Sequence, residues 1–144
     1  MSETGTYRVQ AVKEERLFGM QILIVDDEPD LCNLLAAGLR AFFRCQVTTA
    51  LTAEEALRDL EHSSVQPHVL ISDVQLPGMN GVMFAREFAN LHPEARIILT
   101  SGDIAGALAS DLRPPSNILY LEKPFGLREL AGVIRGIMPK VRTA

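Results

Sequence analysis

The chain of 144 residues contains no apolar stretch near the roughly 20 residues that a membrane-spanning helix needs. It has only two cysteines, Cys32 and Cys45, which have neither metal-ligand spacing nor a secretory signal. Lysine and arginine number 14 against 18 aspartate and glutamate, a net charge of −4, without the clustered basic residues of a nucleic-acid-binding surface. We therefore expect a soluble cytoplasmic protein with reduced, semi-buried thiols that binds no nucleic acid and does not insert into membranes.

Internal repeats and low-complexity segments are also absent, and the length suits one domain with its own core. We expect the folded domain at residues 20–139. Residues 1–19 stand outside the pattern, and we expect there a frayed extension, an added helix or a contact arm, of which a disordered or loosely docked terminus is the commoner outcome. We expect residues 140–144 to form a short tail, with no output domain.

Short runs rich in Ile, Val and Leu alternate with segments whose apolar residues recur at helical spacing. The runs predict five buried parallel strands, near residues 22–25, 46–49, 68–73, 96–100 and 117–122. The segments between and after them predict helices: one from Pro29, one from a capping box at Thr52 to Glu55, one after Gly81, a weak one over 102–112, and one over 127–138. This alternation predicts a doubly wound α/β fold with strand order 2-1-3-4-5 and helices on both faces.

Ionisable residues stand at the ends of three of these runs. Asp26 and Asp27 follow the first run, Asp73 ends the third, and Lys123 follows the fifth. In an open parallel sheet the ligand crevice lies beyond the carboxyl ends of the strands, so we expect the four side chains to converge. Three neighbouring carboxylates repel one another, which indicates either a bound metal ion or a strongly shifted proton equilibrium.

Five motifs, in this order, resemble the receiver domain of bacterial two-component response regulators (CheY-like) over about residues 20–139. The motifs are Val25-Asp26-Asp27-Glu28-Pro29, Ser72-Asp73, Leu76-Pro77-Gly78-Met79-Asn80-Gly81, Leu99-Thr100-Ser101-Gly102 and Lys123-Pro124-Phe125. The resemblance implies a flavodoxin-like fold and a stand-alone phosphoacceptor protein. Such a protein catalyses only its own phosphorylation and dephosphorylation and is not a multiple-turnover enzyme.

The resemblance also implies roles for individual residues. Asp73 matches the phosphoacceptor, a nucleophile whose carboxylate becomes an acyl phosphate. Asp26 and Asp27 match the pair that holds Mg²⁺, with Asp73 itself and the backbone carbonyl of Gln75 completing the set of oxygen ligands. Lys123 matches the lysine that contacts the phosphate.

Two further residues resemble the family's switch pair. Thr100 is expected to bind the phosphoryl group and move toward it, and Tyr120 to rotate inward behind that movement. We expect structural roles for Gly81, in the turn after the third strand, and for Pro124, whose bond to Lys123 is often cis in this family. The exposed surface would then change by a population shift.

The implied partners are a sensor histidine kinase or histidine phosphotransfer protein as phosphoryl donor, and a downstream protein target. The face formed by the fourth helix, the fifth strand and the fifth helix is the first candidate for a dimer interface. The sequence names neither the kinase nor the target.

Other interpretations of the same residues stay open. Asp26 and Asp27 could be acids that cap the first helix, and Thr100 an ordinary strand residue. A haloacid-dehalogenase-type phosphatase would need a second Asp where Gln75 stands. A pseudo-receiver that acts only as a docking module remains the main alternative, although such modules usually lose one of the key residues and this chain keeps them all.

Overall fold

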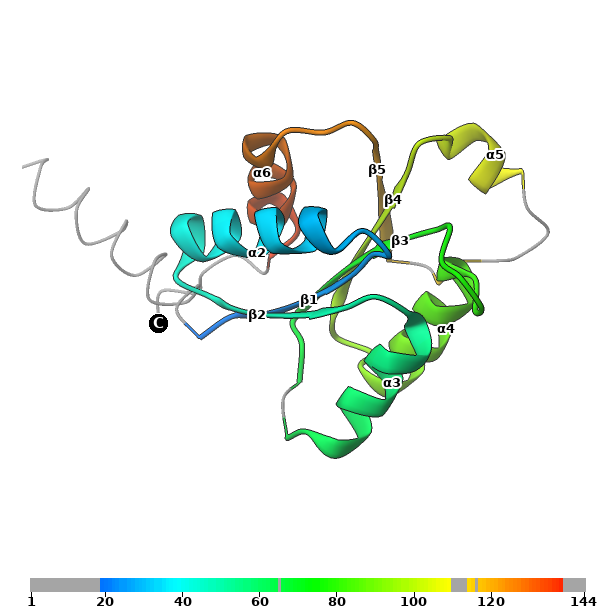
Figure 1. Cartoon of the computed structure of the whole chain (residues 1–144), viewed down its shortest axis with the longest axis horizontal. Coiled ribbons are helices and arrows are strands. Elements are labelled where there is room, and N and C mark those ends of the chain that lie inside the picture. Colours follow the sequence, from blue (N-terminus) through cyan, green and yellow to red (C-terminus); the bar gives the residue numbers. More distant parts are fainter. Residues whose placement is uncertain (1–18, 65, 110–113, 116, 139–144) are drawn as a thin grey trace, which may run out of the picture.

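The computed structural model describes residues 19–64, 66–109, 114–115 and 117–138, and their strands form one parallel sheet. The order is β2-β1-β3-β4-β5, so the predicted fold class and strand order are confirmed (Figure 1). The strands are β1 (Gln21–Val25), β2 (Gln46–Ala50), β3 (Val69–Asp73), β4 (Arg96–Ser101) and β5 (Ile118–Glu122). The predicted extension at 1–19 and tail at 140–144 lie outside the described residues, except for Gly19.

Helices cover both faces of the sheet (Figure 1). On one face lie α2 (Pro29–Phe43) and α6 (Leu127–Ile137), and on the other lie α3 (Ala53–His62) and α4 (Gly81–Leu91). The short α5 (Ile104–Leu108) packs against β4 and β5. Within the described part of the chain, no helix has the length and apolar character to cross a membrane.

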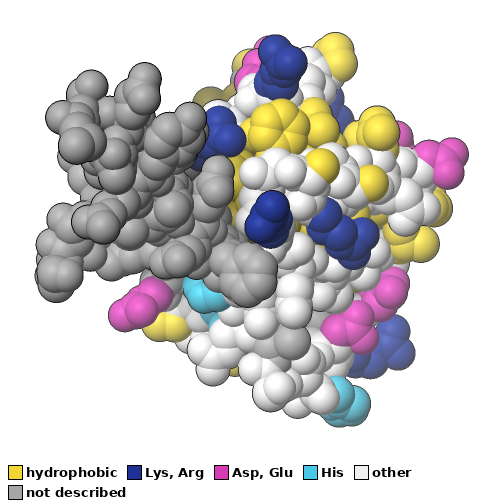
Figure 2. Space-filling view, turned by 90° about the vertical axis from the view of Figure 1, so that its left-hand side faces the viewer, with side chains coloured by type: hydrophobic (Ala, Val, Ile, Leu, Met, Phe, Trp, Pro, Cys, Tyr) yellow, Lys and Arg dark blue, Asp and Glu magenta, His cyan; other side chains and the backbone are white. Residues whose placement is uncertain are grey.

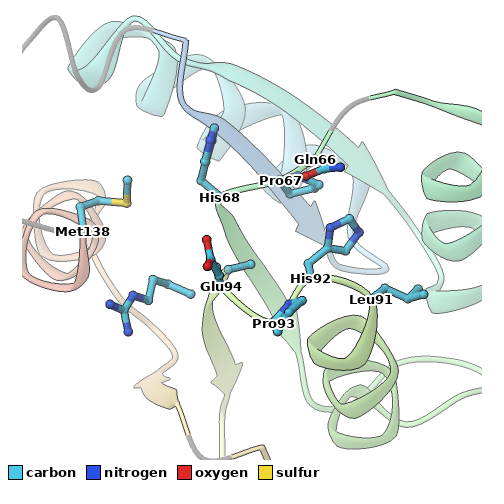
Figure 3. Close-up of a pocket in the computed structure, with 10 residues that line it drawn as sticks. Gln66, Pro67, His68, Leu91, His92, Pro93, Glu94 and Met138 are labelled. Atoms are coloured by element: carbon cyan, nitrogen blue, oxygen red, sulfur yellow. The ribbon is translucent and has the colours of Figure 1, made fainter.

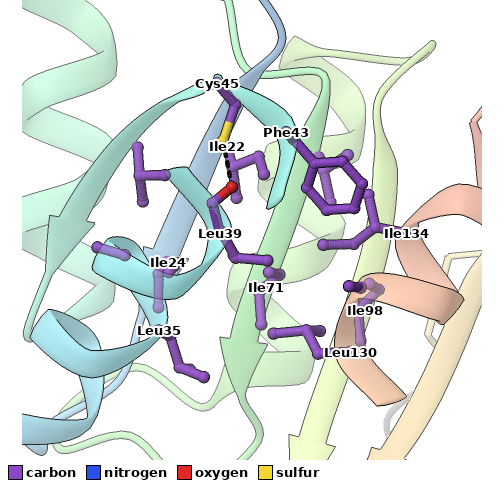
Figure 4. Packing of buried hydrophobic residues seen from close by; sticks show 14 of the residues in the cluster. Ile22, Ile24, Leu35, Leu39, Phe43, Cys45, Ile71, Ile98, Leu130 and Ile134 are labelled. Atoms are coloured by element: carbon purple, nitrogen blue, oxygen red, sulfur yellow. Dashed lines mark hydrogen bonds between the residues drawn. The ribbon is translucent and has the colours of Figure 1, made fainter. Parts of the chain in front are cut away.

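Two apolar layers, one on each face, hold the sheet between the helices. Alternate β1 residues enter different layers, because successive side chains of a strand point to opposite faces: Ile22 and Ile24 join one, and Leu23 and Val25 the other. Figure 4 shows the first layer, where residues of α2 and α6 meet the central strands: Leu35, Leu39, Phe43, Leu130 and Ile134 over Ile22, Ile24, Ile71 and Ile98. All five residues of β3 are buried as a result.

Three local predictions need correction. The helix expected over 102–112 begins at Ile104 and ends at Leu108 in the described residues, with no buried residue, because that segment lacks large apolar anchors. The capping box is only half formed. Thr52 Oγ1 accepts a hydrogen bond from the Glu55 N–H at 3.1 Å, but the Glu55 carboxylate accepts from the Leu51 N–H at 3.2 Å rather than from Thr52. Finally, β2 and β5 are not the fully buried strands that were predicted. They are the two edge strands of the sheet, and only Val47 and Ala50 of β2 and Leu121 of β5 are buried.

Charged side chains of both signs share the surface seen in Figure 2, where lysine and arginine lie among aspartate and glutamate around hydrophobic side chains. Arg135 lies 5.9 Å from the ring centroid of Phe42, which is 37% exposed on α2. Such a guanidinium–ring contact shields part of an apolar side chain that has no place in either layer.

Candidate functional site

Two buried carboxylates and one ammonium group meet at the carboxyl edge of the sheet. Asp26 and Asp73 are only 3% and 8% exposed. Asp26 directly follows β1 and Asp73 is the last residue of β3, and these two strands are neighbours in the sheet. Lys123, just after β5, places Nζ 2.8 Å from Asp26 Oδ2 and 3.0 Å from Asp73 Oδ2. The predicted convergence of these three side chains is therefore present, with the exposed Asp27 directly beside them in the chain.

The backbone orients all three groups. Asp26 Oδ1 accepts a hydrogen bond from the Glu28 N–H, and Asp73 Oδ1 accepts one from the Gln75 N–H, both at 3.0 Å. Each carboxylate thus presents one oxygen to a backbone amide and the other to Lys123. The backbone N–H of Lys123 in turn donates to the Ser101 carbonyl at 2.8 Å, and the Lys123–Pro124 peptide is cis.

Lys123 keeps its positive charge in this setting. Burial alone lowers its pKa, but the hydrogen bonds from Nζ to Asp26 and Asp73 and the negative charges of both carboxylates outweigh burial. The net effect raises the pKa of Lys123 above its ordinary value, so the side chain is a fixed cation at neutral pH.

The acidic residues after β1 fit a hard divalent cation. One carboxylate oxygen each from Asp26, Asp27 and Glu28 lies within 4.8 Å of the others, and all these donors are oxygens, as Mg²⁺ prefers. Glu28 was not among the candidate metal ligands inferred from the sequence. Its place directly after Asp26 and Asp27, in an unbroken acidic run before Pro29, could have indicated it. Gln75 follows Asp73 by two residues and is exposed, at the start of the loop after β3.

Thr100 lies on β4 and Tyr120 on β5, the two strands farthest from β2 in the sheet. Thr100 is the register partner of Asp73, is 2% exposed, and donates a long hydrogen bond of 3.5 Å to the Ser72 carbonyl. Tyr120, on β5, is half-buried and pairs in register with Leu99 of β4. Burial raises the pKa of its phenol. The two residues are thus on adjacent strands, with Thr100 next to the acidic group.

Gly81 is required by a close approach of two backbones. An ideal Cβ at this position would lie 2.1 Å from the Asp73 carbonyl oxygen and 2.7 Å from Val74 Cα. The Gly81 N–H also donates to the Val74 carbonyl at 2.9 Å. A side chain at Gly81 would push α4 away from the end of β3, which bears Asp73.

A pocket of about 460 Å³ lies at the opposite, amino edge of the sheet (Figure 3). It is lined by segments that precede β3 and β4, including His68 and His92, together with Met138. His68 Nδ1 accepts from the Gln21 N–H at 3.0 Å, and the His92 ring lies 4.9 Å from that of Phe88. These contacts place both histidines at the edge of the sheet opposite the acidic cluster, with a structural partner for each.

The family described as "Response regulator receiver domain" matches residues 22–135, which include all the acidic residues above and Lys123. The chain belongs to this family. Receiver domains are signalling proteins of two-component systems, so the predicted resemblance and class are confirmed.

Curated relatives differ widely in their own length. The receiver domain is 31% identical over 121 residues to "Sensor kinase CckA" of Brucella abortus, matching 83% of this chain but 12% of that protein. It is 28% identical over 120 residues to "Response regulator receiver protein CpdR" of the same organism, covering 96% of it. It is 30% identical to "Transcriptional regulatory protein TrcR" of Mycobacterium tuberculosis, covering 45% of it.

Solved structures give the same result. A putative response regulator from Chloroflexus aurantiacus is 31% identical, with a TM-score of 0.69 over 83% of this chain and 97% of its own. The receiver domain of the hybrid histidine kinase CckA is 28% identical, with a TM-score of 0.68 over 81% and 96% of the two chains.

Proposed function

We propose that this receiver domain accepts a phosphoryl group on Asp73, with Mg²⁺ bound by the neighbouring acidic residues. The donor would be a phosphohistidine of a sensor histidine kinase or a histidine phosphotransfer protein. One observation carries the proposal: Lys123 Nζ lies within 3.0 Å of Oδ2 of both Asp26 and Asp73, beside an all-oxygen cluster. A lysine in this position pairs with carboxylates before the reaction and with a phosphoryl oxygen after it.

The Asp73 carboxylate has the electrons for nucleophilic attack. Each of its oxygens accepts one hydrogen bond, from the Gln75 N–H or from Lys123, and each keeps a second lone pair. An Asp73 oxygen would form a bond to phosphorus while the donor's phosphorus–nitrogen bond breaks, and the electron pair returns to the histidine ring. When bound, Mg²⁺ would offset the repulsion between the carboxylates and the incoming phosphoryl oxygens.

The bound phosphoryl group would then change the surface near β5. Thr100 can exchange its long hydrogen bond to Ser72 for a bond to a phosphoryl oxygen, and Tyr120 on the next strand would follow inward. Leu108 and Leu119 are 59% and 43% exposed on α5 and β5, and they give this region an apolar surface for a downstream protein or a second copy. The response would be a population shift between two surfaces, set by how much the phosphoryl group stabilises one of them.

The test is labelling with phosphoramidate, which carries the same phosphorus–nitrogen bond as phosphohistidine. With Mg²⁺ we expect stoichiometric, acid-labile label in the wild type and none in Asp73→Asn, and no label in either when a chelator removes the metal. Asp59→Asn, on the exposed part of α3, is the matched control and should label like the wild type. Undiminished labelling of Asp73→Asn would exclude Asp73 as acceptor, and a wild type without label would favour a docking module that is not phosphorylated.

A further inference from the structure

The loop between β3 and α4 is tied down at both of its ends. At its start, the Val74 N–H donates to the Thr100 carbonyl at 2.9 Å, and the Gln75 N–H donates to Asp73 Oδ1 at 3.0 Å. At its end, Asn80 Oδ1 accepts from the Val82 N–H at 2.7 Å and so caps α4. Gln75, at the start of the loop, also carries the backbone carbonyl that is part of the proposed set of metal ligands.

The apex of this loop is held by a different element. Glu54, in the first turn of α3, accepts a hydrogen bond at Oε1 from the Met79 N–H at 3.0 Å, across 25 positions of sequence. Gly78 has a φ of +79°, and an ideal Cβ there would lie 2.9 Å from the same Glu54 oxygen. The carboxylate therefore lies against the Gly78–Met79 backbone, in a space that a side chain at position 78 would occupy.

We propose that Glu54 is a positioning residue for the metal site, which it influences only through the β3–α4 loop. This inference rests on the proposed function, because it concerns the metal that the function requires. A carboxylate-to-amide hydrogen bond is stronger than a neutral one, and it fixes the loop apex beyond Gln75. Loss of this bond frees the apex, so the Gln75 carbonyl is less well oriented toward a cation held by the acids after β1.

Glu55 offers a matched control within the same turn of helix. Its carboxylate accepts from the Leu51 N–H at 3.2 Å, on the β2 side of α3, and is not the partner of Met79. Glu54→Ala and Glu55→Ala each remove one negative charge, one residue apart, and each remove one hydrogen bond to a backbone amide. Only Glu54→Ala releases the loop after Asp73. Glu54→Gln keeps an acceptor oxygen without the charge.

The experiment has two readouts on the full chain. In the metal-free protein, amide hydrogen exchange at Met79 should be roughly 10-fold faster in Glu54→Ala and unchanged in Glu55→Ala, because only the first removes the Met79 acceptor. In a Mg²⁺ titration followed by the amide signals of residues 26–28 and 75, Glu54→Ala should raise the dissociation constant roughly 3- to 10-fold. Glu54→Gln should fall between it and the wild type, and Glu55→Ala should stay within about two-fold of the wild type.

Equal behaviour of Glu54→Ala and Glu55→Ala in both readouts would overturn the positioning role. Faster Met79 exchange with unchanged Mg²⁺ affinity would also overturn it, since Glu54 would then stabilise the loop without serving the metal. A wild type whose signals do not respond to Mg²⁺ would overturn the proposed function itself, and the Met79 exchange would still report on the hydrogen bond alone.

Discussion

The centre of the sheet and its β5 edge are built differently. Every residue of β3 is buried, and helices cover both of its faces, whereas Leu121 is the one buried residue of β5. The neighbouring α5 has only five residues, none of them buried, while α4 buries five of its eleven. Dense packing on both sides fixes the centre, and the edge has fewer contacts to lose when it moves.

This difference separates the chemistry from its output. Asp26 and Asp73 follow or end the two central strands, where a carboxylate is held in one orientation. Thr100 belongs to β4, the strand that joins the centre to the edge, and Tyr120 belongs to the edge itself. A group bound at the centre can therefore change the edge without reorganising the core.

The largest expected effect is on thiol reactivity beside the centre. Cys32 is 1% exposed beneath Asp26, and burial, with the charge of Asp26 as the second cause, raises its pKa from 9.0 to about 11. At pH 8 its thiolate fraction should be about 100-fold below that of an ordinary thiol. A cysteine introduced at the exposed Ala105 of α5 should react with iodoacetamide at the ordinary rate, which mass spectrometry can follow. Equal rates at both positions would contradict the comparison.

The sign of the pH effect on stability follows from the same shift. The unfolded thiol ionises near 9.0 and the folded thiol near about 11, so the free energy of unfolding falls as the pH rises through this window. Cys32→Ser should lessen that fall in urea titrations at pH 8 to 11.

The next effect is steric. Gly81→Ala places a methyl group against the backbone of Asp73 and Val74, and we expect a loss of about 2–3 kcal/mol in the free energy of unfolding. Gly102→Ala, at the start of the β4–α5 connection, meets nothing within 4 Å and should change it by less than about 0.5 kcal/mol. Urea unfolding measures both. If Gly81→Ala is as stable as Gly102→Ala, the backbone at the end of β3 can shift to make room for a methyl group, which would contradict the comparison.

A smaller effect is expected from the cation at the centre. Lys123→Met removes two hydrogen bonds and leaves two buried carboxylates without their ammonium partner, which should cost about 1–2 kcal/mol without metal. Added Mg²⁺ should restore part of this loss, because a second cation then neutralises the carboxylates. Arg128→Met on the exposed part of α6 should show neither change in thermal unfolding.

The smallest effect on stability belongs to Thr100. Thr100→Val keeps the shape of the side chain and removes a hydrogen bond of 3.5 Å, so stability should change by no more than about 0.5 kcal/mol. In Thr100→Val, the response of Tyr120 to a phosphoryl group or its mimic at the acidic site should nevertheless be lost. Thr49→Val on β2 should leave this response intact. A full response of Tyr120 in Thr100→Val would mean that another residue carries the signal.

Most of the fold follows from the sequence, because the buried strands β1, β3 and β4 appear as continuous apolar runs and the strand ends locate the site. Asp26, Asp73 and Lys123 were found in this way, since strand ends in one parallel sheet share one edge. The contacts that depend on exact backbone paths were not predictable. The hydrogen bond from Met79 to Glu54 joins two segments that share no sequence pattern. The capping-box pattern likewise does not show that the Glu55 carboxylate accepts from the Leu51 N–H and not from the Thr52 N–H.

The most direct test of the account is an amide NMR titration with beryllofluoride and Mg²⁺, a mimic of the phosphoryl group. We predict that signals near Asp26, Asp73 and Thr100 shift directly on binding, that β5 around Tyr120 follows, and that the amino end of β2 and the carboxyl end of α3 stay unchanged. Asp73→Asn should show no response to beryllofluoride. Unchanged wild-type spectra at saturating reagent, or equal shifts in Asp73→Asn, would contradict the claim that Asp73 binds the phosphoryl group at a fixed centre and changes a movable edge.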